Sequence, residues 1–312
     1  MPTPQAPSAA RPWLGVLLLI VCAGAWSLNG PLIKLLAREG VAGVTIASYR
    51  SLFGGLLLLP FVIRRLGTLR NVHYGWSIAG VVTFTVMTVS FVIANTLTAA
   101  ANAITLQYTA PLWVFLLSPL VLREHPRRAE GVVLLITLAG AGVIFAGNHH
   151  TDVLGLIIAL ISGFSYAMLM MVLRALRPVN PLVVACLNAL GSGVALLVPV
   201  LALGVWKPTP TGLGLLVFMG IVQFILPYAI FSAALRHIEA YRASLILLLE
   251  AILNPLWTYL AVGEIPARAT FFGGPLILVG VAAWLLLSWR SRVAVPPVRR
   301  EAELRGSRPP SP

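Results

Sequence analysis

Charged residues, and acidic ones above all, are scarce in this chain. Asp, Glu, Lys and Arg make up 10% of its 312 residues, and only 9 residues are acidic. Because a soluble domain carries about 25% charged residues, this composition excludes a soluble protein with one large core. Hydrophobic residues make up 59% of the chain, and its mean hydropathy is +0.93. The sequence therefore predicts a polytopic membrane protein that lies in a lipid bilayer.

Cysteine is also scarce, and the common enzyme signatures are missing. Cys22 and Cys186 lie inside apolar segments without a C-x-x-C partner, so neither a disulfide framework nor a zinc site is indicated. The sequence has no G-x-x-x-x-G-K, H-E-x-x-H or G-x-S-x-G pattern, the signatures of a P-loop, a metalloprotease and a hydrolase nucleophile. We therefore expect that the protein is not an enzyme and that it binds no cofactor or metal.

The net charge is +13, but it does not indicate nucleic-acid binding. The basic residues stand at the ends of apolar segments and in the C-terminal tail, not on one soluble face. With the N-terminus placed in the cytoplasm, 17 Lys and Arg residues lie on the inner side and 4 on the outer side. This bias predicts a cytoplasmic (inner) membrane protein with both termini in the cytoplasm.

The chain repeats itself at a constant offset of 140 residues. Glu124-x-Pro126 near the end of the first half matches Glu264-x-Pro266 near the end of the second. The other matched pairs are Gly15 and Gly155, Trp26 and Tyr166, Lys34 and Arg174, Gly80 and Gly220, Phe84 and Phe224, Phe91 and Phe231, and Gly140 and Gly280. Two copies of one unit in a membrane protein usually build a pathway at their interface.

Apolar segments of roughly 20 residues, the length of a membrane-spanning helix, are separated by charges, Pro or Gly. We predict ten such helices, at 13–36, 43–63, 74–94, 97–121, 130–147, 153–173, 181–203, 212–234, 241–262 and 270–289. Five helices per repeat is an odd number, so the second repeat is inverted relative to the first. The predicted parts are an N-terminal segment 1–12, five-helix repeats 13–147 and 153–290, and a basic disordered tail 291–312.

Two ionisable residues, Arg50 and Glu250, lie well inside predicted spans. Charged residues at such depth usually face the bundle interior or a wet cavity. We predict that Arg50 binds a carboxylate or another anionic group, and that Glu250 binds an amine or a coupling proton. Alternatively, Arg50 could clamp backbone carbonyls, Glu250 could be a protonated carboxyl bonded to a neighbouring helix, or the two could form an ion pair.

Proline residues predict helix breaks at Pro111 and Pro255, because proline frees a backbone carbonyl. Broken helices beside polar side chains are typical of membrane binding sites, although an ordinary kink is the alternative. Polar and aromatic side chains at mid-span depth complete the predicted substrate-binding set, with helix packing as their alternative role. They are Trp26, Asn29, Gln107, Tyr108, Tyr166, Asn188, Gln223, Tyr228 and Asn254.

The ordered set of motifs resembles the EamA family of the drug/metabolite transporter superfamily over about residues 13–290. The motifs are Trp26-Ser27-Leu28-Asn29 with Lys34, Ser48-Tyr49-Arg50 before Gly54-Gly55, Gln107 to Pro111 with Glu124-His125-Pro126, and Leu249-Glu250 with Glu264-Ile265-Pro266. The resemblance implies a ten-helix inverted-repeat fold and export of small metabolites, commonly amino acids. The family often has proline directly after the equivalent of Glu250, whereas Ala251 follows here and the proline comes at Pro255.

We therefore expect an all-α secondary active transporter that works by alternating access, for which a monomer is sufficient. Its small-molecule substrate is expected to bind near mid-membrane between the repeats, with protons as the candidate coupling ion. The alternatives are a facilitative exchanger or uniporter of nucleosides, sugars or organic cations, a channel, a scaffold and, least favoured, a polytopic membrane enzyme.

Overall fold

The fold is described from a computed structural model, over residues 12–71, 74–121, 128–147, 153–176, 178–234, 237, 243 and 246–293. All regular elements within these residues are helices. Seven helical segments of this part of the chain are long and apolar enough to cross a membrane, and Leu134–Gly147 and Pro210–Gln223 are shorter apolar helices. The prediction of an all-α polytopic membrane protein is confirmed, whereas the count of ten spans stays a prediction.

The helices divide between the two halves of the chain. Those of the first half are α1 (Pro12–Ser27), α2 (Asn29–Arg38), α3 (Gly43–Val62), the 3-10 helix η1 (Ile63–Asn71), α4 (Tyr74–Leu97), α5 (Ala100–Gln107), α6 (Ala110–Val121) and α7 (Arg128–Gly147). Those of the second half are α8 (Val153–Ala175), α9 (Pro181–Ala202), α10 (Pro210–Gly220), the π-helix η3 (Ile221–Ile225), α11 (Leu226–Ala234), α13 (Leu249–Val262) and α14 (Arg268–Val293).

Local sequence explains several helix ends. Asn180 and Thr209 precede α9 and α10, where their side chains accept hydrogen bonds from the backbone N–H groups of Leu182 and Gly212 at 3.0 Å each. Each helix then begins with proline, which has no N–H to leave unpaired in the first turn. Gly263 ends α13 with a φ of 70°, a left-handed conformation that favours glycine.

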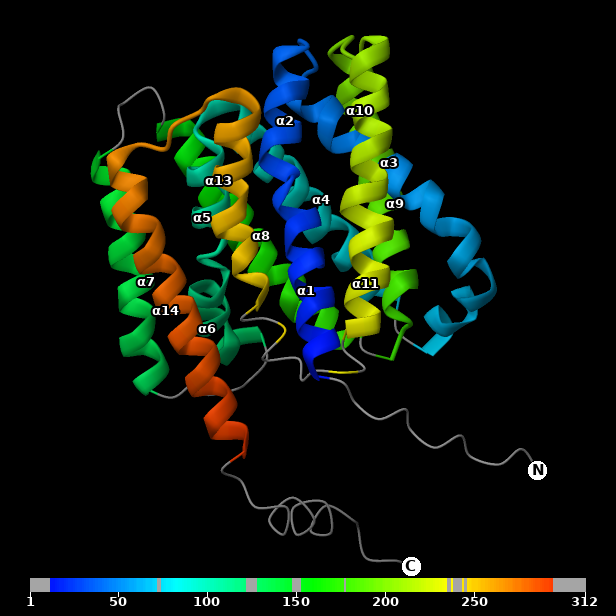
Figure 1. The fold of residues 1–312 in the computed structure, drawn as a ribbon. Helices are drawn as coiled ribbons and strands as arrows, with labels where there is room; N and C mark the ends of the chain where they lie inside the picture. Colours follow the sequence, from blue (N-terminus) through cyan, green and yellow to red (C-terminus); the bar gives the residue numbers. More distant parts are fainter. Residues whose placement is uncertain are drawn as a thin grey trace, which may run out of the picture.

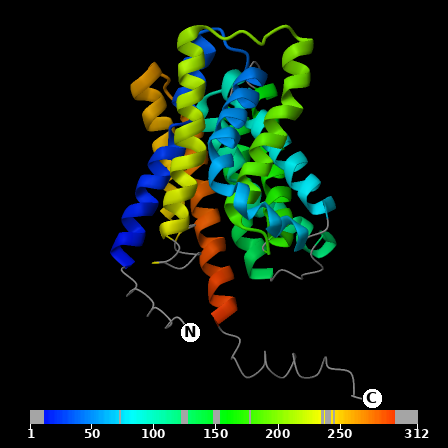
Figure 2. The ribbon, with the colours of Figure 1, turned by 90° about the vertical axis from the view of Figure 1, so that its right-hand side faces the viewer.

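The helices form a bundle with two distinct ends (Figures 1 and 2). The described chain enters at the start of α1 and leaves at the finish of α14, and both lie at the lower end. The connections from α2 to α3, from α9 to α10 and from α13 to α14 lie at the opposite end. We call these the lower end and the upper end.

Close helix pairs hold the bundle together, and glycines let their backbones approach. α7 packs along α14, where a Cβ at Gly140 would lie 2.6 Å from the carbonyl oxygen of Gly273. α3 packs along α9, where a Cβ at Gly55 would lie 2.9 Å from the backbone nitrogen of Leu190. The pairs α4 with α8 and α1 with α11 complete the main contacts. Small residues serve the same purpose in other membrane bundles.

Two helices of the first half are interrupted inside the bundle. The predicted span 13–36 consists of α1 and α2, which are separated at Leu28. Pro31, early in α2, lacks the N–H that would bond the carbonyl of Ser27 in one continuous helix. The span predicted at 97–121 is divided into α5 and α6 by a turn at Tyr108 and Thr109, directly before Pro111.

In the second half the interruption lies elsewhere than at Pro255. α13 runs from Leu249 to Val262 without a break and contains Pro255 in its interior. Membrane helices accommodate proline where neighbouring groups satisfy the freed backbone, so a single proline does not have to end the helix. The interruption lies at Leu248, directly before α13, and Glu250 stands in the first turn of this helix.

Candidate functional site

Arg50 lies on α3 and is almost fully buried, with 5% of its surface exposed. Its Nη1 donates a hydrogen bond of 2.5 Å to Oδ1 of Asn29, the first residue of α2. Its Nε has no hydrogen-bond partner. A buried donor left unpaired costs about 1–3 kcal/mol, so this guanidinium favours an additional acceptor such as a carboxylate.

Glu250 lies beside Tyr108, at the interruption between α5 and α6. The hydroxyl of Tyr108, in the turn between α5 and α6, lies 3.1 Å from Oε2 of Glu250 and 3.2 Å from the carbonyl oxygen of Leu247. The N-terminus of a helix stabilises negative charge in its first turn, where Glu250 stands. The start of α13 and the α5–α6 turn thus bring one polar group from each half of the chain together.

Arg50 and Glu250 have different partners and do not form an ion pair with each other. The ion pair within 4.0 Å in the described part of the chain joins Lys34 and Glu264. From the helix rise, Arg50 lies about 10 Å below the upper end of α3, and Glu250 about 18 Å below the upper end of α13. With the upper ends of α3 and α13 taken as level, the two residues differ in depth by roughly 8 Å.

Asn254 lies next to both the Arg50–Asn29 pair and the Tyr108–Glu250 pair. It stands one turn after Glu250 on α13 and is fully buried, and neither Oδ1 nor Nδ2 has a hydrogen-bond partner. Its side chain packs against Gly30, the neighbour of Asn29, since a Cβ at Gly30 would lie 2.9 Å from Cγ of Asn254. A buried amide without hydrogen-bond partners is rare and calls for an explanation. A bound ligand would satisfy it, so Asn254 is a candidate ligand-binding residue.

Trp26 and Gln223 join α1 to η3 by two hydrogen bonds. The indole Nε1 of Trp26 donates to the carbonyl oxygen of Gln223 at 3.2 Å, and Nε2 of Gln223 donates to the carbonyl oxygen of Ala25 at 3.0 Å. Gln223 belongs to the π-helix η3, and π-helical turns are frequent at functional sites. This pair of bonds holds the end of α1 against η3.

The remaining predicted binding residues contact other parts of the bundle. Gln107 donates from Nε2 to Oγ of Ser162 at 2.7 Å, which ties α5 to α8. Asn188 is buried on α9 beside Gly80 of α4, and its Oδ1 has no hydrogen-bond partner. Tyr166 is half-buried and packs on an apolar cluster of α3, α8 and α9. The side chain of Tyr228 lies outside the part of the chain that the structure describes.

Two buried hydroxyls were missed by the sequence analysis. Ser51, next to Arg50 on α3, and Ser192, on α9, are fully buried, and neither Oγ has a hydrogen-bond partner. Serine is common in membrane helices, where it often bonds its own backbone, so its presence in an apolar span gives no specific signal.

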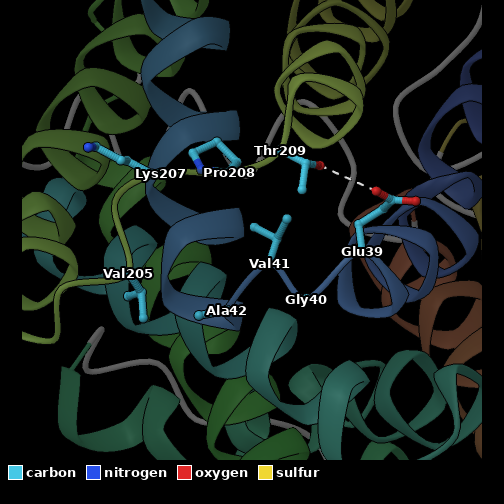
Figure 3. A pocket seen from close by; sticks show the side chains of 8 residues that line it. All are labelled: Glu39, Gly40, Val41, Ala42, Val205, Lys207, Pro208 and Thr209. Carbon is cyan, nitrogen blue, oxygen red and sulfur yellow. Dashed lines mark hydrogen bonds between the residues drawn. The ribbon is translucent and has the colours of Figure 1, made fainter.

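A cavity of about 300 Å³ lies at the upper end, between the α2–α3 turn and the segment that joins α9 to α10 (Figure 3). Oγ1 of Thr209 donates to Oε2 of Glu39 at 3.3 Å. Lys207 points away in Figure 3, and its Nζ lies 4.4 Å from the centre of the Trp206 ring. None of the predicted binding residues lines this cavity, so it is separate from the candidate site.

Comparison with protein families identifies the chain. The EamA-like transporter family matches it twice, at residues 13–146 and 153–286. The chain belongs to the EamA family. The resemblance of its sequence motifs to that family is therefore confirmed, and this EamA protein is a multi-pass membrane transporter.

Two relatives of this EamA protein are named as uncharacterized transporters. One, from Archaeoglobus fulgidus, is 28% identical over 84% of this chain and 93% of its own length. The other, YwfM of Bacillus subtilis, is 24% identical over 85% of this chain and 91% of its own length. A solved crystal structure with 22% identity aligns with a TM-score of 0.61 over 88% of this chain and 98% of that chain, which shows a shared fold.

Proposed function

We propose that this EamA protein is a secondary active transporter that exports small zwitterionic metabolites, such as amino acids, across the cytoplasmic membrane by alternating access. The observation that carries the proposal is the arrangement of Arg50 and Glu250. Arg50 bonds Asn29 at the start of α2, and Glu250, at the start of α13, bonds Tyr108. By helix rise the two charged residues differ in depth by roughly 8 Å. One substrate can therefore meet a cation from the first half and a carboxylate from the second.

The proposed architecture is ten spans in two inverted repeats, residues 13–147 and 153–290. The helix pairing supports it, because α9 and α14 stand at an offset of 140 residues from α3 and α7 and pack against them. Units related by a two-fold axis in the membrane plane are expected to meet through such equivalent helices. The lower end, where α1 starts and α14 finishes, is the proposed cytoplasmic side, because among the described residues more Lys and Arg stand on segments at this end than at the upper end.

The proposed chemistry divides the substrate between two groups. Arg50 binds the carboxylate through donors such as the unpaired Nε, and a planar guanidinium is well suited to a carboxylate. Glu250 binds the amine or, when the substrate has left, a proton. Asn254, buried between the two pairs without a partner, supplies additional hydrogen bonds. Proton binding at Glu250 couples transport to the pH gradient.

Counterflow tests this function directly. Purified protein is reconstituted into proteoliposomes loaded with a mixed amino-acid pool, and entry of labelled amino acids is followed with and without a pH gradient. We expect saturable uptake by the unaltered protein and by the Glu39→Gln variant, since Glu39 lies outside the site. Arg50→Leu should insert normally but transport poorly.

Full transport by the Arg50→Leu variant would remove Arg50 from the substrate site. Absence of flux for every amino acid, from protein shown to be folded, would contradict the proposed substrate class. The search would then move to nucleosides, sugars or organic cations in a facilitative exchanger or uniporter.

A further inference from the structure

Lys34 and Glu264 join the two halves of the chain at the upper end of the bundle. Nζ of Lys34 lies 2.6 Å from Oε2 of Glu264 and donates to the carbonyl oxygen of Thr98 at 2.8 Å. Oε1 of Glu264 accepts from the backbone N–H of Ala100 at 2.7 Å. The two side chains are 17% and 22% exposed, so water screens this pair less than a surface ion pair.

The placement of the negative charge in this pair matters, because Glu264 caps the start of α5. Ala99, the residue before α5, makes no side-chain hydrogen bond that would cap the helix. The first N–H groups of a helix have no partner within the helix, and a carboxylate there is favoured by the helix dipole. Glu264, 164 residues away in sequence, supplies this cap, while Lys34 bonds the carbonyl of the turn that leads into α5.

Two further hydrogen bonds join the two halves of the chain in the same region. Nη2 of Arg38, the last residue of α2, donates to the carbonyl oxygen of Val262 at 2.5 Å. Oγ1 of Thr270, at the start of α14, donates to Oδ1 of Asn102 in α5. These two bonds tie α2 and α5 of the first half to the end of α13 and the start of α14 in the second.

Lys34 is also linked to the candidate site through a single short helix. It stands five residues after Asn29, which bonds Arg50, and both belong to α2. α2 is separated from α1 at Leu28, so a bend at this junction would move Asn29 and Lys34 together. A displacement of α2 therefore changes the Arg50–Asn29 contact and the Lys34–Glu264 contact together.

We propose that Lys34, Glu264 and the start of α5 form an upper lock, which closes the substrate pathway on the upper side and breaks whenever the site opens there. This inference rests on the proposed alternating-access function. In the conformation described here the lock is formed, so the protein is closed at its upper end. A substrate carboxylate that competes with Asn29 for Arg50 would free α2 and favour opening of the lock.

Labelling of a buried thiol tests the lock without a known substrate. The native cysteines are replaced by alanine, and Ser27→Cys or Ser51→Cys provides a probe thiol, since both serines are fully buried on either side of the Asn29–Arg50 contact. A membrane-impermeant thiosulfonate is added to right-side-out vesicles, and the labelling rate is measured.

Glu264→Gln and Lys34→Gln should each accelerate labelling of at least one probe by about tenfold, as expected when a charge-assisted contact is lost from the closed state alone. Glu39→Gln is the matched control, because Glu39 lies at the same end but bonds Thr209, and it should leave the rate unchanged. Equal rates for both probes in the lock variants and in the control would overturn the proposal. Thermal unfolding in detergent identifies any variant that fails to fold, and Lys34→Arg, which keeps the charge, should label slowly.

Exchange of the two charges separates this lock from a simple ion pair. In Lys34→Glu combined with Glu264→Lys, a cation faces the Ala100 N–H and a carboxylate faces the Thr98 carbonyl. We expect labelling to stay fast, and slow labelling would overturn the role of the two backbone contacts. Accelerated labelling in protein that fails counterflow would support the lock and contradict only the proposed substrate. Unchanged labelling in protein that transports would overturn the lock alone.

Discussion

Gly30 offers a sharp test of how α2 and α13 meet beside the candidate site. Substitution by alanine would add a Cβ whose nearest neighbours are the terminal atoms of the Asn254 side chain, with Cγ and Nδ2 both at 2.9 Å. Carbon atoms in contact prefer about 3.5–4.0 Å. Asn254 is fully buried, so it has no open solvent into which it can move, and α2 and α13 must separate.

The expected loss of stability follows from two opposing terms. Overpacking of a buried contact costs about 1–3 kcal/mol. Replacement of glycine by alanine inside a helix returns about 0.5–1 kcal/mol through the entropy of the unfolded chain. We therefore expect Gly30→Ala to reduce the free energy of unfolding by about 1–2 kcal/mol, which lowers the melting temperature in detergent by several degrees.

Asn254→Ala provides the second arm of a double-mutant cycle. It removes all three atoms that the new Cβ would meet, and it also removes a buried amide whose Oδ1 and Nδ2 have no partner. Alone it should be close to neutral. Combined with Gly30→Ala it should abolish the loss, with a coupling energy of about 1–2 kcal/mol between the two positions.

Gly24→Ala is the matched control, because a Cβ at Gly24 meets nothing within 4 Å. It should leave the melting temperature unchanged or raise it slightly. The reasoning would be refuted if Gly30→Ala were as stable as Gly24→Ala. Additive effects of Gly30→Ala and Asn254→Ala would refute it equally, because they would show that the two residues do not touch.

Two further predictions concern proton coupling and the α7–α14 contact. Glu250→Gln should abolish the pH dependence of counterflow, since glutamine cannot carry the proton, and unchanged pH dependence would remove Glu250 from coupling. Gly140→Ala should lower stability by about 1–3 kcal/mol, because its Cβ would lie 2.6 Å from the Gly273 carbonyl oxygen, whereas Gly142→Ala, with nothing within 4 Å, should not. Equal melting temperatures for these two variants would contradict the described packing.

Much of the helical layout could be predicted from the sequence. Hydropathy and charge placed the start of α3 at 43, of α8 at 153 and of α9 at 181, as the structure has them. The weakly marked boundary near 95–96 lies at Thr98 and Ala99 in the structure, because alanine and threonine continue the apolar pattern without a charge. Hydropathy and charge carried these predictions, since both can be read from the sequence alone.

The separation of α1 from α2 was not foreseen. The span 13–36 has the length of one membrane-spanning helix, and Pro31 lies only three residues beyond the junction at Leu28. A proline within an apolar span does not by itself predict a helix break. Pro31 lies beside an interruption, whereas Pro255 lies inside an unbroken helix. The difference depends on neighbouring helices, which the sequence does not specify.

The partners of the candidate residues were the least predictable part. The sequence named Arg50, Asn29, Tyr108 and Glu250, but not that Asn29 bonds Arg50 or that Tyr108 bonds Glu250. Trp26 and Gln223 stay predicted substrate-binding residues, but the sequence did not show that each donates a hydrogen bond to the other's helix. Contacts between residues about 200 positions apart depend on the assembled bundle, not on local propensity.

Arg50 and Glu250 are proposed to bind the two charged groups of one substrate. Binding of both groups is tested most directly by inhibition of counterflow with three forms of the transported amino acid: the free acid, its methyl ester and its N-acetyl derivative. We predict that only the free zwitterion competes strongly with the unaltered protein, and that Arg50→Leu no longer distinguishes the acid from the ester. Equal competition by all three forms in the unaltered protein would contradict binding of both charged groups.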